Sequence, residues 1–189
     1  MGFHFDIEKA VQVVAYLLKH EPNRQASIMK LLKLLYIADR ESLRDAGFPI
    51  TGDDPVAMQH GPVLTRIYNL MKTPGDWEEP TREEDLWCQV FKRESGKLLT
   101  LLRDPGDDLL SDYERQKLDE VLSKYGSLTA AELRGATHEF PEWRNNEVGG
   151  SSVPIPLKDI LEAVERAEDF EIIEADAQED KLIARLLAR

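Results

Sequence analysis

Histidine is the residue type in this chain best suited to acid–base chemistry and metal binding, because its ring titrates near physiological pH. The sequence contains His4, His20, His60 and His138. None of them has a second histidine three to five residues away, the spacing at which two rings commonly ligate one zinc ion. The pattern therefore predicts neither a metal site nor a pair of catalytic histidines.

Other chemical signatures are equally sparse. Cys88 is the single cysteine, and beside Trp87 in an expected strand it is interpreted as a small buried thiol, which is less reactive than an exposed thiolate. Gly61, Gly75 and Gly96 stand apart, so the sequence holds no glycine-rich phosphate-binding loop. We therefore expect a protein that is not an enzyme and that needs no cofactor.

Three aromatic side chains keep two interpretations each. His60 precedes a Gly-Pro turn, where a histidine either lines a cleft or, as we favour, bonds its ring to the backbone and fixes the turn. His138 ends an expected helix, where its ring either lines a cleft or, as we favour, pairs with free carbonyl groups. Trp143 is interpreted as a residue that seals the core, although an exposed tryptophan would anchor an interface.

Helices must position these residues, because apolar side chains recur at helical spacing along most of the chain. Ser111 with Glu114, and Thr129 with Glu132, have the spacing of capping boxes, which start helices. The pattern predicts helices over residues 7–18, 28–43, 63–71 and 111–126, from residue 129, from residue 160 and over 175–189, with an extended segment at 56–60 and a loop at 147–156.

A change of pattern after the Pro- and Gly-containing segment at 73–80 predicts strands. Alternating residues at 87–92 and 97–102 flank Gly96, as expected for an antiparallel β-hairpin. The fold class is therefore mainly α, a compact helical domain with a small antiparallel hairpin, or α+β in a strict classification. We expect these residues to be buried: Leu31, Leu34, Leu35, Tyr36, Val63, Ile67, Leu118, Val121 and Leu133.

Composition indicates a folded protein whose acidity is concentrated in its second half. The 189 residues are 42% hydrophobic and carry a net charge of −12, and residues 159–180 hold ten carboxylates against Arg166 alone. We expect a domain at 1–149 and an acidic, helical C-terminal extension at 150–189. No leader pattern precedes the first helix and no apolar run is long enough to span a membrane, so a cytoplasmic location is expected.

Three blocks of sequence carry a resemblance to a known family. They are Leu31–Ala38, His60–Tyr68, and the segment from Leu110 through Tyr125-Gly126 to Thr137-His138. In this order and spacing they resemble the Panacea or SocA-type antitoxin domain, over about residues 5–145. The family's closing Pro-Trp pair departs from the pattern here, because Glu142 is inserted between Pro141 and Trp143.

The resemblance implies an antitoxin that is encoded beside a toxin and holds it in a direct complex, and one type of relative delivers its toxin to a protease as an adaptor. Members occur in bacteria and their phages. We expect a toxin partner, no direct contact with nucleic acid and no membrane, and we leave self-association open. The expected partner-binding residues are His60, Gly61, Pro62, Arg66, Trp77 and Trp143.

The acidic extension supplies a second candidate surface. Glu162, Glu165, Glu168 and Asp169 would attract a basic partner, or they form a solvated helix face that keeps the protein soluble. Two alternatives to the antitoxin stay open, a phage or prophage regulatory protein and a hydrolase that uses His60 or His138.

Overall fold

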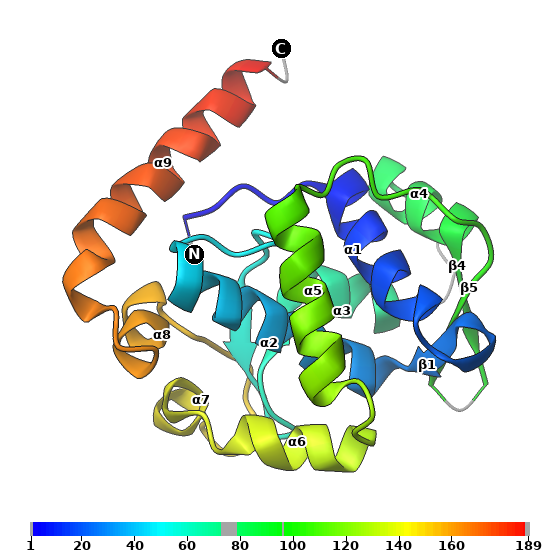
Figure 1. Ribbon diagram of the computed structural model, residues 1–189, viewed down its shortest axis with the longest axis horizontal. Helices are drawn as coiled ribbons and strands as arrows, with labels where there is room; N and C mark the ends of the chain where they lie inside the picture. The colour runs from blue at the N-terminus through cyan, green and yellow to red at the C-terminus, as the bar shows by residue number, and fades with distance from the viewer. Residues whose placement is uncertain (1, 73–78, 96, 188–189) are drawn as a thin grey trace.

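The computed structural model describes residues 2–72, 79–95 and 97–187, and it confirms a mainly α-helical fold with a small β component (Figure 1). The first part of the chain forms α1 (Ile7–Lys19), η1 (Pro22–Arg24), β1 (Gln25–Ser27), α2 (Ile28–Ala46), β2 (Pro55–Ala57), β3 (Val63–Leu64) and α3 (Thr65–Lys72). The middle forms α4 (Arg82–Val90), β4 (Phe91–Glu94), β5 (Leu98–Leu101), α5 (Asp112–Tyr125), α6 (Ala130–His138) and α7 (Pro141–Asn146). The last part forms β6 (Val153–Pro154), α8 (Leu157–Ala163), η2 (Ala167–Asp169) and α9 (Phe170–Leu187).

Helix α2 lies at the centre of the core. It contacts α1, α3, α5, α6 and α8, and α5 crosses it on the face turned to the viewer in Figure 1. Residues 31–39 of α2 are buried on all sides, which is why this helix reads as a nearly continuous apolar run. All nine residues expected to be buried are at most 4% exposed, so the predicted helix registers are confirmed.

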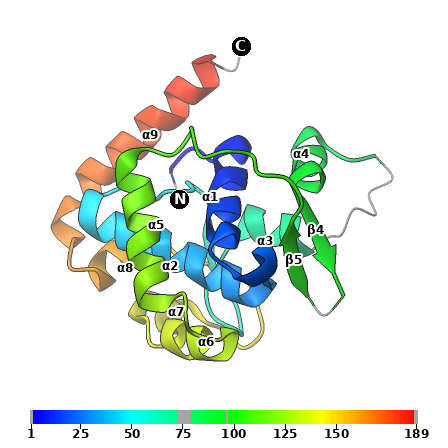
Figure 2. The ribbon, with the colours of Figure 1, turned by 45° about the vertical axis from the view of Figure 1, so that its right-hand side comes forward.

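Two small antiparallel sheets flank these helices. One has the strand order β1-β5-β4 and projects at the edge of the molecule beside α4 (Figure 2). The other has the order β3-β2-β6 and brings the segment after α7 back to the middle of the chain, with Val56 opposite both Val63 and Pro154. Residues 153–154 therefore pair with a strand about one hundred residues earlier.

The predicted hairpin exists, but its first strand begins later than expected. Trp87–Val90 is helical, because Thr81 and Glu84 form a capping box that starts α4. Leu86 and Val90 then lie one turn apart on the face that packs against α1. Cys88 consequently lies on a helix and is exposed, so its interpretation as a buried strand residue is wrong. Gly96 lies outside the described residues.

The third helix also starts later than expected. Val63 and Leu64 form β3, and α3 begins at Thr65. The carboxylate of the buried Asp53 accepts hydrogen bonds from the amides of Arg66 (3.0 Å) and Ile67 (2.9 Å), so a residue distant in sequence caps this helix. The predicted loop at 147–156 contains the short strand β6, which the glycine- and proline-rich composition concealed.

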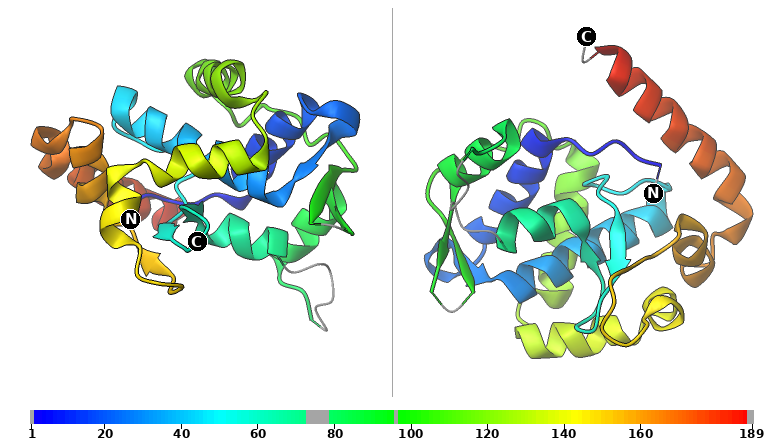
Figure 3. Two further views of the ribbon diagram at one scale, coloured as in Figure 1. Left: turned by 90° about the horizontal axis from the view of Figure 1, so that it is seen from below. Right: turned by 180° about the vertical axis from the view of Figure 1, so that it is seen from behind.

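Both predicted capping boxes are present, at Ser111–Glu114 and at Thr129–Glu132. Helix α9 begins at Phe170 rather than near Ala175, and it leans away from the body toward the C-terminus (Figures 1 and 3). Among the described residues, no helix is both long and apolar enough to cross a lipid bilayer.

Candidate functional site

The Gly-Pro turn between β2 and β3 presents His60 to solvent while Gly61 and Pro62 are buried. The amide of Gly61 donates to the carbonyl of Met58 at 2.9 Å, which closes the turn. Gly61 has a φ of +94°, a conformation that side chains rarely adopt. The turn therefore requires glycine at this position and points the residue before it outward.

Helix α2 holds the turn from inside through Lys33. The Lys33 ammonium group donates to the carbonyl oxygen of Pro62 at 2.7 Å, and the side chain is 0% exposed. Burial, with a smaller contribution from the positive charge of Arg134, lowers the pKa of Lys33 to about 7. A lysine that loses its charge near neutral pH thus lies directly beneath the exposed turn.

Helices α6 and α7 close the other side of the turn. The His138 ring stacks on the Trp143 ring at 4.0 Å between centroids, and its Nε2 is buried. Trp143 Nε1 donates to the carbonyl of Met58 at 3.0 Å. We call this assembly of the 58–62 turn with Lys33, Thr137, His138 and Trp143 the Gly-Pro junction.

The junction corrects the expected roles of both histidines. The His60 ring is exposed and does not fix the turn; the Trp143 indole, on which the His138 ring stacks, donates to the turn instead. The His138 ring stacks on Trp143 rather than bonding to the free carbonyls of α6, so the expected pairing is wrong as well, and Arg144 Nε donates to the His138 carbonyl at 2.9 Å. Burial, followed by the charges of Arg134 and Lys33, lowers the pKa of His138. Trp143 is half-buried at the edge of the core, as interpreted.

Replacing Gly61 by alanine should disrupt the junction. A methyl group there would lie 2.8 Å from Lys33 Nζ and 2.9 Å from Thr137 Oγ1, at a φ that strains any L side chain. We expect Gly61→Ala to lower the free energy of unfolding by about 1–3 kcal/mol, measured by urea denaturation. Gly135→Ala is the matched control, because a methyl group on that helical residue meets no atom within 4 Å. Equal stability of the two variants would contradict the described packing.

A second polar cluster lies behind the junction, around Glu142 on α7. Glu142 is 0% exposed, and its Oε1 accepts hydrogen bonds from Tyr36 Oη at 2.9 Å and from Arg40 Nε at 2.7 Å. Arg40 also stacks over the Phe140 ring at 4.2 Å. Burial and the neighbouring Glu142 carboxylate raise the pKa of Tyr36 above its ordinary value. This cluster fixes α7 on α2 and so fixes the position of Trp143.

The remaining sequence candidates lie elsewhere. Arg66 on α3 is exposed, pairs with Glu83 and covers the Phe5 ring at 4.1 Å. The structure therefore brings His60, Gly61, Pro62 and Trp143 together at the junction and places Arg66 apart from them. Trp77 lies outside the described residues.

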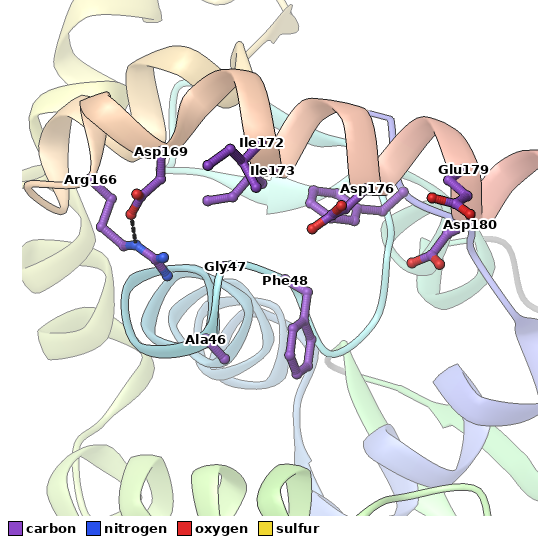
Figure 4. Close-up of a pocket in the computed structure, with 11 residues that line it drawn as sticks. Ala46, Gly47, Phe48, Arg166, Asp169, Ile172, Ile173, Asp176, Glu179 and Asp180 are labelled. Carbon is purple, nitrogen blue, oxygen red and sulfur yellow. Dashed lines mark hydrogen bonds and ion pairs between the residues drawn. The ribbon is translucent and has the colours of Figure 1, made fainter.

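The four acidic candidates differ in their surroundings. Glu162, Glu165 and Glu168 are exposed, whereas Asp169 is half-buried and accepts from Arg166 Nε at 2.7 Å. Figure 4 shows this pair at one end of a groove of about 370 Å³ between α9 and the end of α2, with Asp176, Glu179 and Asp180 further along α9. The groove wall on α9 is thus strongly acidic.

The polar groups of the junction and of the Glu142 cluster are enclosed by helices, an arrangement that orients a surface loop. Within the described ranges, no three His, Cys, Asp or Glu side chains gather closely enough to hold a metal ion. Sequence reasoning overlooked Lys33, Tyr36, Arg40 and Glu142. The available signal was a lysine inside an apolar run and a glutamate inserted into a family motif.

These features define a helical protein that displays a rigid turn from a core of buried polar contacts. The family model described as "Antitoxin SocA-like, Panacea domain" matches residues 31–144, which span every element of the junction and the Glu142 cluster. The chain therefore belongs to the SocA-like antitoxin family with a Panacea domain. Comparison with curated proteins and with solved structures gave no match.

Proposed function

We propose that this protein neutralises a cognate toxin by binding it directly, without catalysing a reaction. The observation that carries the proposal is its membership of the SocA-like antitoxin family over residues 31–144. The geometry supports it, because the ionisable groups of the junction are used to hold the scaffold together. A binder needs a surface of fixed shape, and a turn held from inside loses little conformational freedom on binding.

The proposed contact surface has two parts. The first is the exposed end of the Gly-Pro junction, where His60 faces solvent and Trp143 is half-buried. The second is the face around the exposed Arg66 and the half-buried Glu83 with which it pairs. Aromatic and arginine side chains at such positions supply much of the binding energy in protein interfaces.

The exposed carboxylates of α8, of η2 and of the turn between them would act on the rate of association. Glu162, Glu165 and Glu168 are exposed and would attract a basic toxin over about one Debye length, roughly 8 Å at physiological salt. Such long-range attraction raises the association rate constant and makes it fall with added salt. The shape of the junction would supply the specificity.

The decisive experiment expresses this protein together with the toxin encoded beside it. We expect restored growth, co-purification of the two proteins, and an affinity at least about tenfold lower for His60→Ala, as for a binding hot spot. His4→Ala is the matched control, because His4 is also exposed but precedes α1. Both variants should keep wild-type thermal stability, since they change exposed side chains. Association rates measured over a salt series report the electrostatic contribution.

The outcomes of this experiment distinguish direct neutralisation, hydrolysis and delivery of the toxin to a protease. Rescue without a physical complex would contradict direct neutralisation. A folded His60→Ala protein that binds the toxin normally yet fails to rescue would favour the hydrolase instead. An adaptor that delivers toxin to a protease would shorten the lifetime of the toxin in cells, whereas neutralisation by holding would leave that lifetime unchanged or longer.

A further inference from the structure

Helix α9 is attached to the body by one face only. Ile173 and Ala177 are 4% and 0% exposed and pack on the core, while the rest of the helix leans outward in Figures 1 and 2 and in the right-hand view of Figure 3. Its 18 residues correspond to a length of about 27 Å. A long helix face is therefore open to solvent.

That face carries a row of apolar residues. Ile172, Leu182, Ile183 and Leu186 are 65%, 57%, 46% and 59% exposed. With Ala175 they recur at spacings of three, four and seven residues, which places them on one side of the helix. We call these five residues the α9 stripe. A stripe of this kind is the usual contact surface of one helix with another.

The charges of α9 are divided along its length. All five of its carboxylates lie in the first eleven residues, at Glu171, Glu174, Asp176, Glu179 and Asp180, and its described cations, Lys181 and Arg185, follow them. A helix with one acidic and one basic half is complementary to itself in the antiparallel direction. A uniformly basic partner would match the first half and be repelled by the second.

We propose that α9 binds the α9 of a second copy of this chain, antiparallel and about a two-fold axis. In the register that aligns the stripes, Ile172 meets Leu186 and Ala175 meets Ile183. The same register places Glu171 beside Arg185, and the symmetry makes each of these contacts twice. One helix pair buries less than the roughly 1,200–2,000 Å² of stable complexes, so we expect a dissociation constant in the micromolar range.

Glu179 falls at the centre of this register. It lies on the same side of α9 as the stripe, at the edge of the groove in Figure 4, and the two copies of Glu179 face each other near the axis, where like charges repel. The pairing therefore makes a distinctive prediction, because removing this carboxylate should strengthen the dimer although it removes a polar surface group.

Sedimentation equilibrium of the purified full-length chain over a concentration series tests the pairing without any toxin. We expect a monomer–dimer equilibrium that the double change Leu182→Ser with Leu186→Ser abolishes. Leu102→Ser is the matched control, because Leu102 is 56% exposed but follows β5. Circular dichroism checks that each variant is folded.

Charge exchange tests the register. Glu171→Arg and Arg185→Glu should each raise the dissociation constant about tenfold, since each reverses two exposed ion pairs, and the double exchange should restore it. Glu179→Gln should lower the dissociation constant severalfold. A chain that is monomeric at all concentrations would overturn the proposal, and so would a dimer that is unaffected by the serine changes or by the charge exchanges.

Discussion

Glu142→Ala should destabilise the protein by about 3–5 kcal/mol, because it removes the carboxylate nearest to the Arg40 guanidinium in a largely buried site and leaves only Glu41, at 3.8 Å. The Arg40 side chain is 11% exposed and Glu142 is fully buried, so water cannot replace the lost partner easily. Tyr36, which is also fully buried, would lose the acceptor of its hydroxyl group. The free energy of unfolding from urea denaturation measures the effect.

Two control variants test whether the loss of stability comes from removing the buried charge of Glu142. Glu142→Gln keeps the volume and an acceptor for Tyr36 and removes the charge, so we expect a smaller loss than for alanine. Glu139→Ala removes the carboxylate of an ion pair with Arg144 whose side chains are more than half exposed, and should cost no more than about 1 kcal/mol. An effect of Glu142→Ala as small as that of Glu139→Ala would contradict the described cluster.

The sequence predicted correctly the helix starts that depend only on neighbouring residues. Ser111 and Glu114 satisfy each other's amides within one turn, so four residues of sequence suffice to place the start of α5. The same spacing occurs at Thr81 and Glu84. This capping box would have predicted the start of α4 and therefore the position of Cys88, which lies exposed on that helix. The expected strand at 87–90 was wrong because an apolar pattern of so few residues fits either a helix or a strand.

The second sheet could not be predicted, because its causes are not local. Strands β3 and β6 are two residues long, and Val56 pairs with Pro154 across nearly one hundred residues. The start of α3 likewise depends on Asp53, whose carboxylate reaches the helix from the far side of a turn. Only the assembled tertiary structure brings these groups together.

The candidate site was predicted in its residues but not in its interactions. His60, Gly61, Pro62, His138 and Trp143 were all singled out by type and spacing. The turn is held by Trp143, on which the His138 ring stacks, and this depends on the packing of α6 and α7, which no periodicity reports. Lys33 appeared only as an interruption of an apolar run, although a lysine at such a position has to find a buried acceptor.

Lys33 should make the stability of the protein depend on pH above neutrality. Its pKa is about 7 in the folded protein and 10.5 when exposed, so between these values the unfolded chain binds a proton that the folded chain does not. The free energy of unfolding should therefore rise with pH across this window, by at most about 1.4 kcal/mol per pH unit.

The buried Asp39 has the opposite effect on the pH dependence of stability, and it acts at lower pH. Burial raises its pKa from 3.8 to about 7, despite hydrogen bonds from the amides of Ile50 and Thr51. The folded chain therefore binds more protons than the unfolded chain between these values, and stability falls as the pH rises through them. The two groups together predict a minimum of stability near pH 7, where both contributions are least favourable.

Lys33→Met isolates the contribution of the lysine. Methionine keeps much of the volume and carries no charge, so the rise in stability between about pH 7 and pH 9.5 should be absent from the variant while the change below pH 7 persists. Staying below pH 9.5 limits the ionisation of tyrosine and lysine side chains in the unfolded chain. Arg134 and His138, which interact electrostatically with Lys33, are unchanged in the variant. Urea denaturation of both proteins at each pH gives the comparison. Parallel curves for wild type and Lys33→Met above pH 7 would show that the buried amine does not titrate in this range.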